Sequence, residues 1–244
     1  MKKFMALLLV AGMTLSLTAC GGSTDTAKTD QADGKDTFTV GFDQDFPPFG
    51  YVGDDGEFTG FDIEMATECA ARMGKKIVLQ PIDWDAKDME LEAGTIDCIW
   101  NGFTMNGRED QYTWTDPYMD NSQVVVVKKD SGINTLADLA GKVVEVQKES
   151  AAETALNDEE HADLMASFAQ LLSVGEYNTA FMDLESGAVE AVAIDIGVAQ
   201  FQIEGKEDQY QILDETISSE QYAVGFFLGN TALRDEVQST LLEM

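Results

Sequence analysis

The sequence predicts an α/β fold in which strands and helices alternate along the chain and form predominantly parallel sheets. Beyond residue 36, short segments of alternating or β-branched apolar residues are separated by segments whose apolar residues recur at helical spacing. One segment, residues 124–127, is four consecutive valines, which is typical of a strand buried on both faces. Polar and aromatic residues follow directly after several strands. We therefore expect a ligand site at the carboxyl ends of the strands.

The first half of the folded region opens with an alternating strand at residues 38–42, which the FPPF segment at 46–49 ends. Asp54, Asp55 and Gly56 predict a turn between short strands. Asp62 is placed to cap a helix whose apolar residues share one face and which ends at Gly74. The remaining elements of this half are a strand, a short helix and two strands, at residues 77–79, 85–93, 96–100 and 124–127.

The pattern then restarts in the second half of the chain. Its predicted helices cover residues 136–139, 151 onward, 177–185, 197–201 and 233 to the end, and its predicted strands cover 142–146, 191–194 and 222–228. The sequence contains no Gly-x-Gly-x-x-Gly motif, phosphate-binding loop or nucleophile elbow. We therefore expect no cofactor.

Residues 1–19 predict a signal peptide, because Lys2 and Lys3 precede an apolar run that is shorter than the roughly 20 residues of a membrane span. The Leu-Thr-Ala-Cys sequence at 17–20 resembles the lipobox of bacterial lipoproteins, which implies that Cys20 is lipidated. An ordinary signal peptide that ends near a cysteine is the alternative. Residues 20–36 carry no large apolar side chain, so we expect a flexible tether that holds the protein outside the cytoplasm, at the membrane, through the lipid alone.

The composition excludes several classes of function. A formal net charge of −30 disfavours nucleic acid, whose binding proteins carry basic patches. With His161 as the single histidine and no clustered cysteines, the chain offers neither a metal site nor nucleophilic machinery. Cys69 and Cys98 are interpreted as small buried apolar residues, and the sequence does not decide whether they pair.

The residues after the strands form a set with complementary chemistry. Arg108 supplies a fixed cation, Asp43 and Asp195 supply fixed anions, and hydroxyl, amide and aromatic groups accompany them. This set suits a zwitterion that carries an α-carboxylate and an α-ammonium group. The other members are Phe46, Trp84, Asn101, Gly102, Thr104, Ser150 and Ala151.

Several segments together resemble the polar amino acid-binding proteins, the family 3 solute-binding proteins of ABC importers. The segments are residues 39–50, 56–66, 91–104, 115–118, 136–148 and 187–195, in the family order. The resemblance implies a type II periplasmic-binding-protein clamshell with two lobes joined by two crossover strands. It places residues 37–125 and 222–244 in the first lobe and residues 126–221 in the second.

The resemblance also implies roles at the two ends of a bound amino acid. Arg108 corresponds to the family's carboxylate-binding arginine, although the loop from Thr104 to Arg108 is one residue shorter than usual; a solvated surface arginine is the alternative. Ser150 and Ala151 correspond to carboxylate donors at a helix start, after Glu149 where the family usually has glycine. Asp195 corresponds to the acceptor of the α-ammonium group, or else is only a helix cap.

Further positions correspond to groups around the ligand. Thr104, with Asn101 and Gly102, corresponds to residues beside the α-groups. Phe46 and Trp84 correspond to the aromatic pair that encloses the side chain, with core packing as the alternative. Asp43 corresponds to the residue at the distal end of polar or cationic side chains.

Three functions remain after these assignments. The first is a monomeric transport receptor, not an enzyme, that passes an amino acid to an ABC permease and its ATPase subunits. The second is a dehydratase-like enzyme of the same fold, with Asp43 or Asp45 as general acid. The third is a lipid-anchored sensor or adhesin module.

Overall fold

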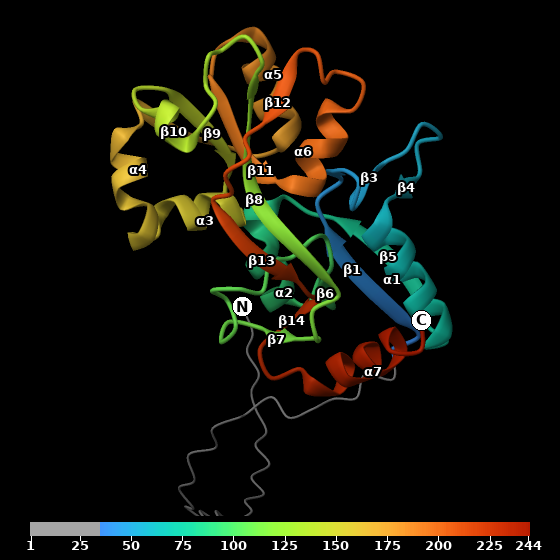
Figure 1. Ribbon diagram of the computed structural model, residues 1–244. Helices are drawn as coiled ribbons and strands as arrows, with labels where there is room; N and C mark the ends of the chain where they lie inside the picture. The colour runs from blue at the N-terminus through green and yellow to red at the C-terminus, as the bar shows by residue number, and fades with distance from the viewer. Residues whose placement is uncertain (1–34) are drawn as a thin grey trace, which may run out of the picture.

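The computed structural model describes residues 35–244, which form two sheet-rich lobes (Figure 1). The predicted signal peptide, Cys20 and the predicted tether up to residue 34 lie outside the described residues. Strands and helices alternate in both lobes, as the sequence predicted. None of the helices between residues 35 and 244 has the length and hydropathy that crossing a membrane requires.

The first lobe is built on two sheets. Its strands are β1 (Thr37–Phe42), β2 (Asp45–Phe46), β3 (Gly50–Val52), β4 (Phe58–Thr59), β5 (Lys76–Pro81), β6 (Cys98–Ile99), β7 (Thr113–Trp114) and β14 (Gly225–Phe226). Its helices are α1 (Phe61–Arg72), the 3-10 turn η1 (Trp84–Ala86), α2 (Lys87–Ala93) and α7 (Thr231–Leu241). The main sheet has the order β5-β1-β6-β14-β7, in which β5, β1 and β6 are parallel and β14 is antiparallel to its neighbours. The small antiparallel sheet β2-β3-β4 precedes α1.

The second lobe is built on one six-stranded sheet. Its strands are β8 (Met119–Lys128), β9 (Val143–Gln147), β10 (Gln170–Val174), β11 (Ala191–Asp195), β12 (Tyr210–Ile212) and β13 (Ser218–Tyr222). Its helical segments are η2 (Leu136–Leu139), α3 (Ala151–Asn157), η3 (Glu159–His161), α4 (Ala162–Ser167), α5 (Tyr177–Ser186) and α6 (Ile196–Ile203). The order is β10-β9-β11-β8-β12. β12 pairs with residues 126–128 of β8, and β13 pairs with residues 119–123 of the same strand. β8 is antiparallel to all three of its partners, β11, β12 and β13.

The run of four valines is confirmed as a strand buried on both faces. Val124 and Val126 pack with α5 and α6, whereas Val125 and Val127 pack on the opposite face with α3. This alternation explains the absence of polar residues in the run, because side chains on both faces of the strand lie in a core. Cys69 and Cys98 are buried and unpaired in the core of the first lobe, which agrees with their interpretation as apolar residues.

Two strands join the lobes. β8 leads from the first lobe into the second, and β13 leads back toward the first; they pair antiparallel from Gln123 opposite Ser218 to Met119 opposite Tyr222 (Figure 1). The predicted lobe boundaries at 125/126 and 221/222 fall inside these two strands, and the boundaries themselves stay a prediction.

One predicted element is wrong in its extent. The strand expected at 222–228 is two short strands in different sheets, because β13 belongs to the second lobe and β14 to the first. The chain changes sheets at Ala223 and Val224, whose N–H groups donate to the carbonyl of Phe103 and the hydroxyl of Thr115 instead of continuing one ladder.

Candidate functional site

A cavity of about 290 Å³ lies between the two lobes. All ten of the predicted ligand-contacting residues line it, together with Gln147, which the sequence reasoning did not single out. They come from the segments that follow β1, β6, β9 and β11 and from the start of η1. The carboxyl ends of strands in the main sheets of both lobes therefore face one cavity. The roles of these residues toward a ligand stay a prediction.

Arg108 reaches the cavity despite the shortened loop that carries it. The loop closes as a tight turn in which the Arg108 N–H donates to the carbonyl of Met105 at 3.0 Å, and Gly107 adopts the left-handed conformation, with φ of 78°. Arg108 is 9% exposed, and its guanidinium carbon lies 5.4 Å from the centroid of the Phe103 ring. The alternative of a solvated surface arginine is therefore excluded.

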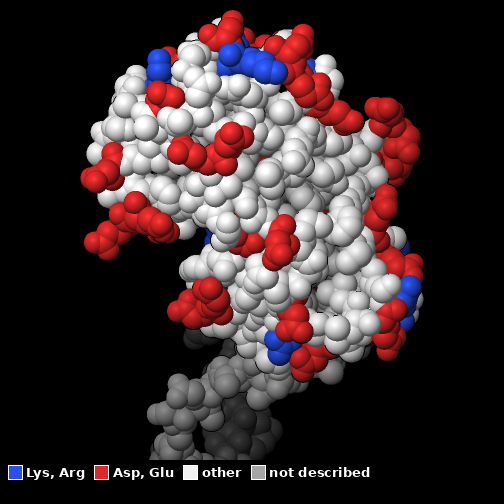
Figure 2. Space-filling view, in the orientation of Figure 1, with Lys and Arg blue, Asp and Glu red and all other residues white. Residues whose placement is uncertain are grey.

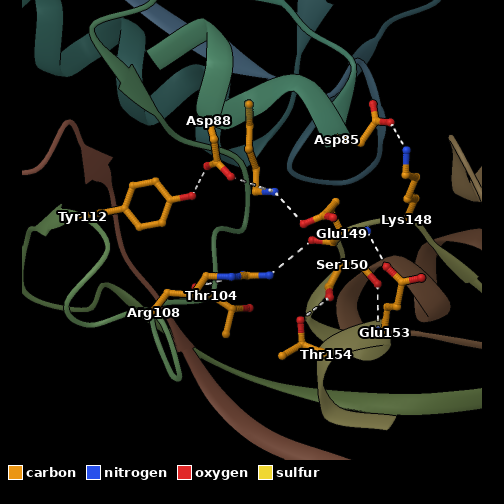
Figure 3. A network of polar contacts seen from close by, with 11 residues as sticks. Asp85, Asp88, Thr104, Arg108, Tyr112, Lys148, Glu149, Ser150, Glu153 and Thr154 are labelled. Carbon is orange, nitrogen blue, oxygen red and sulfur yellow. Dashed lines mark hydrogen bonds and ion pairs between the residues drawn. The ribbon is translucent and has the colours of Figure 1, made fainter. Parts of the chain in front are cut away.

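The hydrogen bonds of Arg108 go to neutral acceptors. Nη1 donates to the carbonyl of Thr104 and Nη2 to the carbonyl of Glu149, both at 3.2 Å, and the second of these bonds crosses from the first lobe to the second (Figure 3). Within residues 35–244, no carboxylate lies within 4.0 Å of the guanidinium group. Its charge thus lacks a counter-charge at the cavity wall.

Glu149 occupies a backbone conformation that favours glycine. Its φ is 60°, and among the described residues it is the one residue other than glycine with a positive φ. Its carboxylate points across the cleft and lies 3.8 Å from Nζ of Lys87, a buried lysine on the first lobe. The acidic side chain at this position therefore pairs with a cation of the opposite lobe.

Ser150 and Ala151 begin helix α3 at the cavity wall. The Ser150 hydroxyl oxygen caps the helix by accepting from the N–H of Glu153 at 3.1 Å, which leaves its hydroxyl hydrogen for another acceptor. Ala151, as the first residue of α3, carries one of the N–H groups that a helix leaves without an intrahelical acceptor. Donors from Arg108, Ser150 and Ala151 thus line the same part of the site.

Asp195 is a buried carboxylate at the end of β11. Its Oδ1 accepts hydrogen bonds from Nδ2 of Asn121, Nε2 of Gln123 and the hydroxyl of Tyr222, at 2.8, 2.7 and 2.5 Å. Burial, followed by the negative charge of Glu220, raises the pKa of Asp195 to about 7. Among residues 35–244, no other residue donates to the second oxygen, Oδ2. No lysine, arginine or histidine nitrogen of these residues lies within 4.0 Å of the carboxylate. The Asp195 side chain makes no cap bond to helix α6, although Asp195 occupies the cap position.

Asp43, Phe46 and Trp84 line the cavity where the small sheet and η1 meet it. Asp43 accepts from the N–H of Asp45 at 2.8 Å and from Nε2 of Gln147 at 2.6 Å, and burial raises its pKa to about 6. The Phe46 ring also packs against Tyr177 of the second lobe, with centroids 6.1 Å apart. Phe46 and Trp84 are both buried, so each lines the cavity and also packs in the core.

Asn101 and Gly102 are fixed by bonds to neighbouring segments. Oδ1 of Asn101 accepts from the N–H of Asp43 at 2.7 Å, and the N–H of Gly102 donates to Oδ2 of Asp62 at 2.5 Å. The prediction that Asp62 caps helix α1 is wrong: Gly60 is the cap residue, and Asp62 is buried within the first turn. Its carboxylate instead holds the loop after β6 in place at the cavity.

The two lobes are in contact around the cavity, so the structure is a closed form. Gln147 bonds Asp43 across the cleft, Nζ of Lys148 lies 2.7 Å from Oδ2 of Asp85, and Nδ2 of Asn178 donates to Asp45 at 2.8 Å. Figure 3 shows the Lys148–Asp85 pair and the Arg108–Glu149 bond, each of which joins one lobe to the other. Within residues 35–244, no group of histidine, cysteine or carboxylate side chains is placed to hold a metal ion.

Sequence reasoning missed the residues that support the cavity from the crossover strands. Asn121 and Gln123 lie on β8, and Glu220 and Tyr222 lie on β13. The available signal was their spacing: Asn121 and Gln123 are two residues apart directly before the four valines, so they share one face if the strand begins before the valines.

The chain matches proteins of known family. The model of the bacterial extracellular solute-binding proteins, family 3, matches residues 38–244. The L-cystine-binding protein TcyJ of Escherichia coli (strain K12) is 29% identical over 243 residues, which cover 98% of this chain and 87% of that protein. The arginine-binding extracellular protein ArtP of Bacillus subtilis (strain 168) is 29% identical over 247 residues, covering 100% of this chain and 93% of that protein.

A solved structure shares the architecture as well. The substrate-binding protein of an ABC uptake transporter from Streptococcus pneumoniae, crystallised with histidine bound, superposes with a TM-score of 0.81 at 32% identity. The match covers 85% of this chain and 86% of that one. All three relatives bind amino acids, and the third belongs to an ABC uptake transporter. The shared architecture confirms the clamshell expectation.

Proposed function

The chain belongs to the bacterial extracellular solute-binding proteins of family 3, and from that membership we propose that it captures a free polar or cationic L-amino acid between its lobes. It then delivers the amino acid to the permease of an ABC transporter. The family and the relatives are receptors and not enzymes, so the dehydratase-like alternative falls away. Nothing among residues 35–244 favours a sensor over a transport receptor.

One observation carries the proposal: a single cavity is lined by Arg108 and Asp195, two nearly buried side chains of opposite charge without a counter-charge. Leaving a buried charge uncompensated is costly. An amino acid supplies a carboxylate for Arg108 and an ammonium group for Asp195. The ligand therefore compensates both charges at once and stabilises the closed arrangement of the lobes.

The surroundings of Asp43 support a polar or cationic side chain. Asp43 and Trp84 also line a wider groove next to the cavity, and five further acidic residues line that groove: Asp45, Asp83, Asp85, Glu90 and Glu176. Both donors to the buried Asp43 carboxylate are neutral, so it attracts a further cation or N–H group and disfavours an apolar partner. The three relatives bind cystine, arginine and histidine, all of which carry polar side chains.

A thermal-shift screen of the twenty amino acids and cystine, followed by calorimetry on those that stabilise, tests the proposal. A ligand at 100 times its Kd adds about 2.7 kcal/mol to the free energy of unfolding, which raises Tm by roughly 5–10 °C. We expect arginine, histidine, glutamine, lysine or cystine to give the largest shift. Tighter binding of leucine or valine than of every polar amino acid would contradict the proposed preference, and no shift with any amino acid would contradict the proposed function.

The same proposal places the protein outside the cytoplasm, tethered by a lipid on Cys20. The Leu-Thr-Ala-Cys sequence and the polar segment after it support this placement. Changing Cys20 to Ala should release the protein from the membrane fraction. Retention of the variant in detergent extracts of membranes would remove the anchor from the proposal. Permease and ATPase genes beside this one would support delivery to a transporter.

A further inference from the structure

Glu220 is a buried carboxylate that no ligand role has been assigned to. It lies on the crossover strand β13 and is 7% exposed. Its Oε1 accepts from Oγ1 of Thr104 at 2.8 Å, from Nδ2 of Asn121 at 2.7 Å and from Nε2 of Gln123 at 2.8 Å. It therefore touches a cavity-lining hydroxyl on the first lobe while it remains behind the cavity wall.

The hydrogen atoms of this network can be assigned by counting donors. The amide nitrogens of Asn121 and Gln123 each donate to Asp195 and to Glu220, which uses both hydrogens of each amide group. An ionised carboxylate carries no hydrogen, so in the contact between Thr104 and Glu220 the hydroxyl is the donor. Thr104 has one hydroxyl hydrogen, and Glu220 holds it.

This assignment decides what Thr104 presents to a ligand. With its hydrogen turned to Glu220, the hydroxyl shows only lone pairs to the cavity. Resting on the function proposed above, we propose that Glu220 is a positioning residue that acts through Thr104 and makes the α-amino end of the cavity an all-acceptor site. Oδ2 of Asp195 and Oγ1 of Thr104 then both require an N–H donor.

An all-acceptor site discriminates by donor count. An α-ammonium group has three N–H donors and satisfies both oxygens, whereas an α-hydroxyl group has a single donor and leaves one oxygen unsatisfied. A site built to hydrogen-bond one group rejects an analogue that lacks it, because the buried acceptor stays unpaired. Glu220 thereby selects α-amino acids over α-hydroxy acids that have the same side chain.

The charge of Glu220 also acts on Asp195. The groups that face Asp195 are Glu220 and Tyr222 from β13, Tyr177 from α5, and the amides of β8, with Arg108 on the same cavity. Of these, Glu220 is the one whose negative charge raises the pKa of Asp195, after burial itself. Replacing Glu220 by a neutral group of the same shape lowers the pH at which Asp195 ionises.

The test is calorimetry on the full chain with L-arginine, L-histidine and the α-hydroxy analogue of each. In Glu220→Leu, the Thr104 hydroxyl loses its acceptor, and its hydrogen is free to turn toward the cavity. Glutamine would not have this effect, because Asn121 and Gln123 donate to the same Oε1 and would keep an amide oxygen in its place. We expect about 10- to 100-fold weaker binding of the amino acid and less than threefold change for the hydroxy analogue. Glu145→Leu, which removes a buried carboxylate on β9, should leave both affinities within threefold.

A double-mutant cycle separates positioning from a general structural effect. In a Thr104→Val background, Glu220→Leu should add less than threefold to the loss, because the hydroxyl that Glu220 positions is gone. The pH below which arginine affinity declines should also be lower in Glu220→Leu than in wild type and unchanged in Glu145→Leu.

Three results would overturn the inference: an unchanged preference of Glu220→Leu for the amino acid, losses that add fully in the double mutant, or an unchanged pH midpoint. Failure of the wild type to bind any free amino acid would be seen first in the thermal-shift screen. That result would overturn the proposed function itself, so the two failures are distinguishable.

Discussion

The two charged ends of the cavity are built in different ways. At the Asp195 end, the carboxylate is surrounded by Asn121 and Gln123 of β8 and by Glu220 and Tyr222 of β13, the two strands that join the lobes. At the Arg108 end, the contacts join the two facing lobes: the carbonyl of Glu149 accepts from Arg108, and the ion pairs Lys87–Glu149 and Lys148–Asp85 cross between the lobes beside it.

The difference indicates when each end forms. β8 and β13 pair along their length near the cavity, so the side chains that donate to Asp195 are held by the ladder between these strands. The Arg108 end needs the lobes to be together, because its partner carbonyl lies on the opposite lobe. We therefore expect changes at the Asp195 end to alter affinity and its pH dependence, and changes between the facing lobes to alter closure.

Removing either cavity charge should give the largest effect. Arg108→Ala and Asp195→Ala each strand the opposite charge of a bound amino acid in a nearly buried site, which costs about 3–5 kcal/mol or roughly two to four decades in affinity. Calorimetry with the amino acid that gives the largest thermal shift measures the loss. Scattering should show compaction of the wild type with that amino acid and none for either variant at the same concentration.

Arg72→Ala is the matched control for this prediction. Arg72 lies on α1 and pairs with the exposed Glu68, so its removal should leave the affinity unchanged. If Arg108→Ala binds its amino acid within threefold of wild type, the shortened loop does not place Arg108 on the carboxylate and the comparison of the two ends fails.

The residues after the strands could be predicted from the sequence because they combine a local pattern with a general rule. Asp43, Asn101, Ser150 and Asp195 each follow a segment with strand periodicity, and the carboxyl ends of parallel strands carry ligand sites. That residues of both lobes would meet at one cavity does not follow from this rule, and was implied by the resemblance to the two-lobed family.

The support behind the cavity could not be predicted, because it arises from long-range pairing. Asn121 and Glu220 are 99 residues apart and meet only because β8 and β13 are antiparallel partners. Their polar side chains, in isolation, are typical of solvent-facing strand positions. The extent of β14 was missed for a similar reason: it is a two-residue strand whose partners, β6 and β7, lie more than 100 residues earlier.

The second prediction concerns pH and the Asp195 end. Asp195 must be ionised to accept an ammonium group, and its pKa in the ligand-free closed form is about 7. Affinity should therefore fall as pH decreases below about 7, by up to roughly tenfold per pH unit. Calorimetry between pH 5 and pH 8 measures this. In Asp195→Asn the remaining affinity should vary much less over that range.

The stability of the ligand-free protein should change in the opposite sense over the same range. The pKa values of Asp43, Asp62 and Asp195 are raised in the folded state to about 6, 7 and 7. Each contributes stability that is present below the unfolded-state pKa and is lost as pH rises through the folded-state value. As pH rises from 4 to 7, the ligand-free Tm should therefore fall, while the increase in Tm that a bound amino acid causes should grow. A ligand-induced shift that is larger at pH 5 than at pH 8 would contradict this.

The smallest effect should come from the ion pair between the facing lobes. Lys148 and Asp85 are both substantially exposed, and such pairs contribute about 0.2–1 kcal/mol. Because the pair forms only when the lobes meet, Lys148→Gln should weaken amino acid binding by no more than about fivefold, without changing the pH midpoint set by Asp195. The difference from wild type should disappear near 1 M salt, where the Debye length is about 3 Å. Lys129→Gln is the control, since its Nζ donates to the carbonyl of Glu207 within the second lobe and should affect binding at no salt concentration. A loss in Lys148→Gln that persists at 1 M salt would mean that Lys148 acts on the ligand end of the site and not on closure.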